Sequence, residues 1–332
     1  MNKRTFSKLT ALLVAVFFGL TACGGSGSES PETVMQKFKD TAKDIKAADF
    51  SVTLAMKGVD KEDNIDFDLY GDIKLDRRED VERKADADVK VEGVLNAGGK
   101  SLDGRLDFKI RTLGENFYFN LMALEANDPG FENLKPIIEP LKTKWQHLAS
   151  DFVPESIREL QQKDPETLER EAQLKELFVK TKLFDVIKEY GDESLKGKKV
   201  YHYGLRINKD GLKAYTSKAA AINGREMTDA EAEEAALFAD SVTNMEMWIG
   251  VKDYYLYKGV VTLGSDNPEN NVSSEVSLTY LANSYDTDMN IEPPAAFEEF
   301  NPITLMMGLQ MPVMSDEEGA ITDEENDMTE AE

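Results

Sequence analysis

Cysteine and histidine are nearly absent from this chain of 332 residues, which has one cysteine, Cys23, and two histidines, His147 and His202. A lone cysteine has no intramolecular disulfide partner, and a cysteine-based zinc site needs several thiolates. The two histidines show neither H-x-x-x-H nor H-E spacing. The sequence therefore predicts no metal site, and we expect neither histidine to be catalytic.

The motifs of nucleotide-binding proteins and common hydrolases are missing as well. No G-x-S-x-G, G-x-x-x-x-G-K-[ST] or G-x-G-x-x-G occurs, so neither a nucleophile elbow nor a phosphate-binding loop is indicated. The acidic stretch 60–66, "DKEDNID", places Ile65 where a calcium loop needs glycine. With 63 acidic residues, spacing alone does not single out a catalytic carboxylate pair. We expect a protein that is not an enzyme and that has no cofactor.

Positive charge is scarce: 39 Lys and Arg residues stand against 63 Asp and Glu residues, for a net charge of -24. A surface this negative repels the phosphate backbone, which excludes nucleic acid as a partner. Nine of the last 18 residues are acidic and none is basic, so residues 315–332 are predicted to form a disordered tail. Cation binding by this tail is the alternative.

Long hydrophobic runs are also lacking. The mostly apolar run 9–20 follows the basic residues Lys3, Arg4 and Lys8. It is too short for the roughly 20 residues of a membrane-spanning helix, and it is typical of a secretory signal. Residues 1–22 are therefore predicted to be a signal peptide, and its removal takes the net charge from -24 to about -27.

The single cysteine directly follows this leader. Leu20, Thr21 and Ala22 precede Cys23, and the order resembles the lipobox of bacterial lipoproteins. The resemblance implies that Cys23 becomes the first residue and carries acyl chains such as palmitate, each methylene contributing about 0.8 kcal/mol to membrane anchoring. The alternative is a stray thiol beside an ordinary cleavage site. Residues 23–30, with "GGSGSES" after the cysteine, are predicted to be a flexible tether.

The first part of the body combines one helix with alternating strands. Ser30, Pro31 and Glu32 form a helix start, and apolar spacing continues this helix to about Ala47. Period-two alternation then predicts antiparallel strands that each bury one side. This meander of roughly six strands covers residues 50–56, 65–70, 73–75, 85–91, 106–110 and 117–121.

The second part mixes helices and strands. A proline-rich connection at 129–154 leads to a helix predicted from Pro165 to about Tyr190. A strand at 198–208, helices at 212–222 and 228–239, and strands at 245–251, 255–263, 276–282 and 287–292 follow. Thr228 and Glu231 form a capping box for the second of these helices. The pattern predicts an α+β fold over residues 31–300, a large curved antiparallel sheet or half-barrel with helices packed in its concave face.

The order of these elements, the lipobox, a "KW" segment and the unit "GKKVYHYGLRINKDGL" at 197–212 together resemble the LolA-like superfamily. That superfamily includes the lipoprotein carrier LolA, the receptor LolB and the LppX/LprG lipid-binding lipoproteins. The resemblance spans about residues 31–300 and implies that the concave face holds acyl chains. The body is longer than such domains usually are, which predicts an insertion around residues 224–239.

The resemblance also implies candidate ligand-binding residues on the concave face. They are Val52, Leu54, Phe67, Leu69, Phe108, Ile110, Phe119, Leu121, Met245 and Met247. Methionine suits a wall that faces ligands of variable shape, because it is unbranched and adaptable. The alternative is that these residues pack against the helices as ordinary core. The Met-rich stretch 305–314 is open to two interpretations in the same way, as a closing helix or as a lid or partner-docking segment.

The sequence thus predicts an extracytoplasmic lipoprotein of the cell envelope or periplasm, anchored to a membrane through lipidated Cys23. Its half-barrel would bind or carry a lipid or acyl chains, with an envelope protein as a further possible partner. The alternative is a structural or regulatory lipoprotein with a filled core, which binds a protein or cell-wall partner through its acidic surface.

Overall fold

A computed structural model describes residues 29–60, 63–78, 83–97, 100–133, 135–149, 152–153, 165–267 and 272–301. The chain divides into two compact units, Met1–Phe300 and Asn301–Glu332. All helices and strands described below belong to the first unit. The predicted signal peptide, Cys23, most of the tether, the Met-rich stretch and the acidic tail lie outside the described residues.

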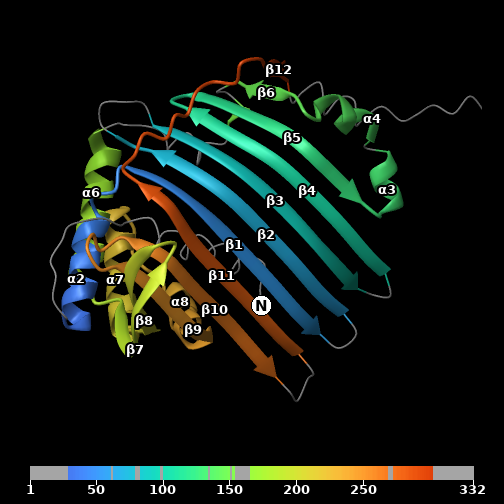
Figure 1. Ribbon diagram of the computed structural model, residues 1–332. Helices are drawn as coiled ribbons and strands as arrows, with labels where there is room; N and C mark the ends of the chain where they lie inside the picture. Colours follow the sequence, from blue (N-terminus) through green and yellow to red (C-terminus); the bar gives the residue numbers. More distant parts are fainter. Residues whose placement is uncertain are drawn as a thin grey trace, which may run out of the picture. The chain divides into compact units, whose positions relative to one another are not determined.

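The fold is built on one open sheet of twelve strands, in the order β12-β6-β5-β4-β3-β2-β1-β11-β10-β9-β8-β7 (Figure 1). Neighbouring strands are antiparallel, except that β12 runs parallel to β6. The strands are β1 (Ala47–Asp60), β2 (Asp63–Asp76), β3 (Lys84–Ala97), β4 (Lys100–Leu113), β5 (Asn116–Ala126), β6 (Trp145–Leu148), β7 (Phe184–Leu195), β8 (Lys198–Ile207), β9 (Val242–Gly250), β10 (Leu256–Asn267), β11 (Val272–Tyr285) and β12 (Glu298–Phe300).

Four longer helices accompany the sheet: α2 (Pro31–Ala42), α6 (Pro165–Lys180), α7 (Lys209–Ile222) and α8 (Asp229–Ser241). Short helical turns, α3 (Pro129–Glu132), α4 (Lys135–Ile138) and η1 (Glu139–Leu141), lie between β5 and β6. The predicted caps are confirmed, because Ser30 accepts a hydrogen bond from Thr33 N and Thr228 forms a capping box with Glu231. An antiparallel sheet with helices on one face confirms the predicted α+β class.

Strands β1 to β6 form the predicted meander. From β1 to β5, each strand forms a hairpin with the next and pairs with it over most of its length. The predicted strands 65–70 and 73–75 are one strand, because β2 continues through Gly71. The sixth strand is instead β6, in the connection where the sequence predicted none. The alternation of apolar and charged residues therefore identified the meander but not its last member.

The helices cover the face of the sheet toward its β7 end (Figure 1), and we call this the inner face. One hydrophobic cluster joins buried side chains of all four longer helices to β1 and β8–β11. Phe38 of α2, Phe50 of β1 and Ile249 of β9 are each at most 2% exposed. This cluster is the core of the unit.

Three predicted boundaries are wrong. Helix α2 ends at Ala42 rather than near Ala47, because Ala47 already pairs with Asp76 of β2. Helix α6 ends at Lys180 rather than near Tyr190, and Phe184 begins a strand that pairs with Ile207. Pairing with a neighbouring strand overrides helical apolar spacing in both places.

The third wrong boundary is the last strand. Residues 287–292 form no strand; Met289 and Ile291 instead pack with Ala47 in a small buried cluster. The final strand is β12, which contains only three residues.

Replacement of Phe38 tests the core. We expect Phe38→Ala to lower the free energy of unfolding by about 3–5 kcal/mol, because the substitution leaves a cavity between α2 and the sheet. Gln36→Ala, on the exposed side of the same helix, is the control and is expected to change stability by less than about 0.5 kcal/mol. Urea denaturation measures both, and equal effects would contradict this assignment of the core.

Candidate functional site

The apolar inner face continues across β2–β5, but its side chains there are not buried. Pairing registers place on this face Val89, Val91 and Leu95 of β3, Leu102, Leu106, Phe108 and Ile110 of β4, and Phe117, Phe119, Leu121 and Leu124 of β5. All of them are half-buried or exposed, and Leu95 and Leu102 are 43% and 41% exposed. In the described part of the chain, none of them belongs to the core cluster that the helices share. Within the described residues, the sheet thus has a filled half and an open half.

A row of small residues crosses the open half. Gly93 of β3 lies directly opposite Gly104 of β4. Across the neighbouring strands, Gly93 pairs with Phe67 of β2, and Gly104 pairs with Ala126 of β5. Because glycine has no side chain, the backbone is accessible at Gly104, whereas at Gly93 the Phe67 ring takes part of this space.

Larger side chains stand on both sides of this row. One ridge contains Leu69, Val91, Leu106 and Leu124, and the other contains Ile65, Leu95 and Leu102. Two ridges with a row of small residues between them form a trough that runs across four strands, and we call it the trough.

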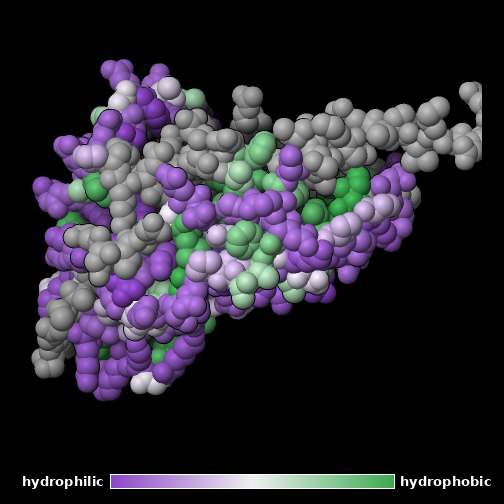
Figure 2. All heavy atoms as spheres, turned by 90° about the horizontal axis from the view of Figure 1, so that it is seen from above, coloured by the Kyte–Doolittle hydropathy of each residue, from purple (hydrophilic) through white to green (hydrophobic). Residues whose placement is uncertain are grey.

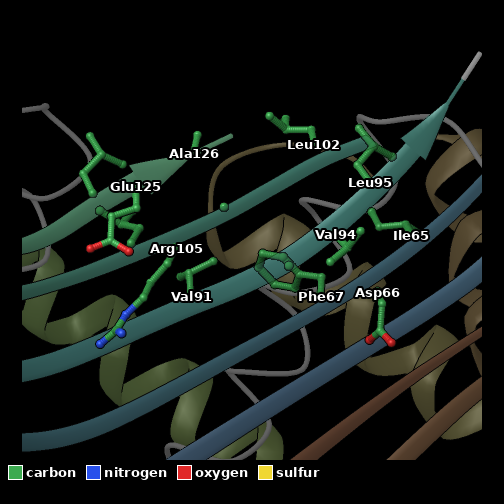
Figure 3. Close-up of a pocket in the computed structure, with 14 residues that line it drawn as sticks. Ile65, Asp66, Phe67, Val91, Val94, Leu95, Leu102, Arg105, Glu125 and Ala126 are labelled. Carbon is green, nitrogen blue, oxygen red and sulfur yellow. The ribbon is translucent and has the colours of Figure 1, made fainter. Parts of the chain in front are cut away.

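The trough coincides with a cavity of about 320 Å³. Ile65, Phe67, Val91, Leu102, Leu124 and other residues of β2–β5 line it (Figure 3). Figure 3 shows the polar ends of Asp66, Arg105 and Glu125 directed away from Leu95 and Leu102. The walls of the cavity are therefore apolar, and the charged groups of the same strands point to the other face.

The opposite, outer face of β3 and β4 carries cross-strand ion pairs. Lys109 lies 2.8 Å from Asp88, and Arg111 lies 3.0 Å from Asp86. In the view of Figure 2, groups of hydrophobic residues lie among hydrophilic ones. The outer face of this half-sheet is thus charged, whereas its inner face is apolar.

The structure separates the predicted ligand-binding residues into three groups. Leu54, Met245 and Met247 are buried in the core cluster beneath the helices. Val52, Phe67 and Leu69 are half-buried at the border of that cluster, and Phe67 also lines the cavity. Phe108, Ile110, Phe119 and Leu121 are half-buried on the open half, beyond the cavity.

The trough residues that the sequence did not single out are Ile65, Val91, Gly93, Leu95, Leu102, Gly104, Leu106 and Leu124. Alternation had already placed Val91 and Leu106 on strands. The pairing of Gly93 with Gly104 depends on the register of two strands, and the sequence carries no direct signal for it.

Both histidine rings lie beside glutamate carboxylates and pack against aromatic rings. His202 Nδ1 lies 2.8 Å from Glu193 and Nε2 lies 3.0 Å from Glu246, so both ring nitrogens have a partner. The ring is stacked between Tyr190 and Trp248, with 4.0 Å between centroids on each side. This arrangement joins β7, β8 and β9 on the outer face, which is a structural role.

His147, predicted to lie in the proline-rich connection, is on β6. Its Nδ1 lies 2.9 Å from Glu299, and its ring packs against Tyr118 and Phe297. Across the described ranges, no group of three or more His, Cys, Asp or Glu side chains is arranged to hold a metal ion. No helix within those ranges has both the length and the apolar character needed to cross a membrane.

Comparison with known proteins gives weak likenesses only. No protein-family model and no curated protein sequence matches the chain. Among solved structures, the Mycobacterium tuberculosis lipoprotein LppX is 11% identical, with a TM-score of 0.28, covering 80% of this chain and 100% of that one.

Two further solved structures are similar at a lower level. A DUF1329 family protein from Desulfovibrio piger is 7% identical, with a TM-score of 0.15, covering 78% of this chain and 92% of that one. A putative outer membrane lipoprotein-sorting protein domain from Vibrio parahaemolyticus is 10% identical, with a TM-score of 0.16, covering 74% and 87%. At these TM-scores no argument follows from the likenesses, and the fold assignment depends on the strand order and register of this chain.

The contacts of His202 predict a dependence of stability on pH. Hydrogen bonds from His202 and from Trp248 Nε1 lower the pKa of Glu193 from its ordinary value of 4.5. A carboxyl whose pKa is lower in the folded state stabilises the fold above its ordinary pKa, and this contribution is lost as the pH falls through the folded value.

We therefore expect the urea midpoint of the wild type to fall more steeply below pH 4.5 than that of Glu193→Gln, which keeps an acceptor but does not titrate. Denaturation curves recorded from neutral to acidic pH check this. Glu189→Gln, on the same strand, is the control and should retain the wild-type slope. Parallel curves for wild type and Glu193→Gln would contradict the assignment.

Proposed function

We propose that this protein is a non-enzymatic carrier or binder of a hydrophobic ligand, either a lipid or the acyl chains of another lipoprotein. The ligand would lie in the trough on β2–β5. Lipidated Cys23 would tether the protein to a membrane on the extracytoplasmic side of the cell envelope. The observation that carries this proposal is the apolar inner face of β3–β5, whose large side chains are left half-buried or exposed.

The energetics of burial support an apolar ligand. Each Å² of apolar surface removed from water contributes about 25 cal/mol, and Leu95 and Leu102 retain about two-fifths of their surface exposure. Single exposed leucines are common on protein surfaces, whereas a continuous apolar patch is typical of a binding site. The trough provides such a patch.

The shape of the trough supports a chain-like ligand. At Gly104 a ligand can lie directly against the backbone between the two ridges, whereas the Phe67 ring lies beside Gly93. The ridges are aliphatic, apart from Phe67 at one end of the row of small residues, and they offer no hydrogen-bond donor to orient a polar ligand. Acyl chains fit these requirements, because they need contact area rather than directional bonds.

The proposed tether would complement this site. Holding the body close to a membrane restricts its search for a source or acceptor of the ligand to a thin layer. The filled half of the sheet would provide a rigid frame, since Leu54, Met245 and Met247 pack against helices there.

Filling the trough tests the proposal. At Gly104 an added Cβ would lie 3.4 Å from the nearest atom, Glu125 O, so Gly104→Leu is accommodated and its side chain occupies the trough. Losing even about 60 Å² of buried ligand surface costs about 1.5 kcal/mol, which is roughly a tenfold loss of affinity.

We expect native mass spectrometry with lipid extraction to detect a bound lipid on the mature chain carrying Cys23→Ser, and we expect a fluorescent fatty acid to bind in the trough. Gly104→Leu should weaken the fatty acid at least about tenfold without lowering the urea midpoint. Ser101→Leu, which adds the same side chain to the outer face of β4, is the matched control. A clean apo mass and no uptake of the fatty acid would reject the carrier and favour a structural or regulatory lipoprotein.

A further inference from the structure

Glu29, just before α2, is held on the body by two side chains. Glu29 forms a salt bridge with Lys37 and accepts a hydrogen bond of 3.1 Å from the hydroxyl of Tyr254. Tyr254 is fully buried and lies between β9 and β10, and Lys37 Nζ stands 4.8 Å from the centre of its ring. The position at which the tether leaves the body is therefore defined.

This position lies at one end of the strands. Tyr255 donates a hydrogen bond of 3.3 Å to Asp286, which also accepts one of 3.1 Å from Ala47 N at the start of β1. We call this the near end of the sheet, and the end where β1 turns into β2 the far end. The trough lies toward the far end, because Ile65 is two residues from the start of β2. With 14 residues at about 3.3 Å each, β1 places the two ends roughly 45 Å apart.

Lysines gather at the near end beside the position of Glu29. The turn at residues 194–199 carries Lys196, Lys198 and Lys199, and the turn at residues 250–255 carries Lys252. The two turns are adjacent, since Val251 N donates a hydrogen bond of 3.1 Å to Lys199 O. We call these four exposed side chains the lysine cluster.

The lysine cluster is not neutralised by ion pairs among the described residues. Lys198 donates to the hydroxyl of Tyr257 at 2.7 Å, and Lys196 donates to Asn283 at 2.9 Å. Asp253, the one acid in the two turns, accepts a hydrogen bond of 2.6 Å from Tyr257. Glu29 is occupied by Lys37 and Tyr254. The cluster is therefore a local excess of positive charge on a chain of net charge -24.

The far end has the opposite charge. Among the described residues at the strand ends there, Asp60, Asp63 and Asp266 stand against Lys100. An anionic surface attracts the lysine cluster and repels the far end, and each lysine close to anionic headgroups changes such an equilibrium by roughly fivefold.

We propose that the lysine cluster binds anionic phospholipid headgroups around the anchor. The near end then faces the membrane and the trough is held away from it. This inference depends on the anchor at Cys23 in the proposed function. Cys23 precedes Glu29 by six residues, so the chain between them spans about 21 Å at most. A tether of this length keeps the near end within reach of the headgroups. It is also shorter than the distance between the two ends of the sheet, which is roughly 45 Å.

The lipidated mature protein, purified from membranes, allows this orientation to be measured. Acylation uses the only native thiol, so Ser194→Cys at the near end and Ser101→Cys at the far end each give a single labelling site. Energy transfer from a fluorophore at each site to an acceptor lipid is compared in phosphatidylcholine vesicles with and without phosphatidylglycerol. We expect much stronger transfer from position 194 than from position 101 when phosphatidylglycerol is present.

Charge variants separate the cluster from net charge. Lys196, Lys198, Lys199 and Lys252, all changed to Gln, should reduce the difference between the two labels to its value in phosphatidylcholine. Lys90, Lys180, Lys213 and Lys218, all changed to Gln, remove the same charge elsewhere on the exposed surface and should retain the difference. Equal transfer from both labels, or equal effects of the two quadruple variants, would overturn the proposal.

The two proposals fail in different ways. If the trough takes up no fatty acid but the label asymmetry persists, the carrier function fails and the orientation stands. If fatty acid uptake is normal but both labels give equal transfer, only the orientation fails. If the mass of the purified protein shows that Cys23 is not acylated, the anchor and the orientation that depends on it are both rejected.

Discussion

The structure depends on one constraint: a single open sheet has to keep one apolar face out of water. Over β1 and β8–β11 this is achieved by α2, α6, α7 and α8, whose apolar residues form one cluster with the strands. Over β3–β5 the same alternation of residues continues without a shared buried cluster in the described part of the chain. The difference between the two halves lies in what covers them and not in the strands. Rigidity therefore comes from the covered half, and the proposed ligand would bind on the other.

Much of the fold was predictable from the sequence, because one-sided strands and helix caps leave local signals. The alternation over β1–β5, Ser30 at the start of α2 and the capping box of α8 are confirmed. The errors are non-local in origin. Phe184 and Ile187 have helical spacing after α6, yet Phe184 pairs with Ile207, a partner 23 residues further along the chain. The short strands β6 and β12 pair with each other across about 150 residues, and no window of sequence contains both.

The trough illustrates the same limit. Gly93 and Gly104 are eleven residues apart and meet only because the hairpin of β3 and β4 sets its register at the turn. Alternation placed Leu54, Phe108 and Met245 alike on the inner face of the sheet. It contains no information on where helices cover that face. Leu54 and Met245 are buried and Phe108 is not, and this distinction comes from tertiary packing. Whether a position belongs to core or to an open surface is therefore a property of the neighbours of a strand.

In the described part of the chain, the sheet has two outer edges, at β12 and at β7, and both have features that disfavour edge-to-edge association. The edge at β7 has register irregularities between Val186 and Lys188 and between Glu189 and Gly191, and its residues 187–194 are exposed and mostly charged or polar. Bulges twist an edge away from a partner strand, and charges make the docking of another chain unfavourable. The edge at β12 is only three residues long. Both edges therefore disfavour the strand-to-strand pairing by which an open sheet would become the repeating unit of a fibre.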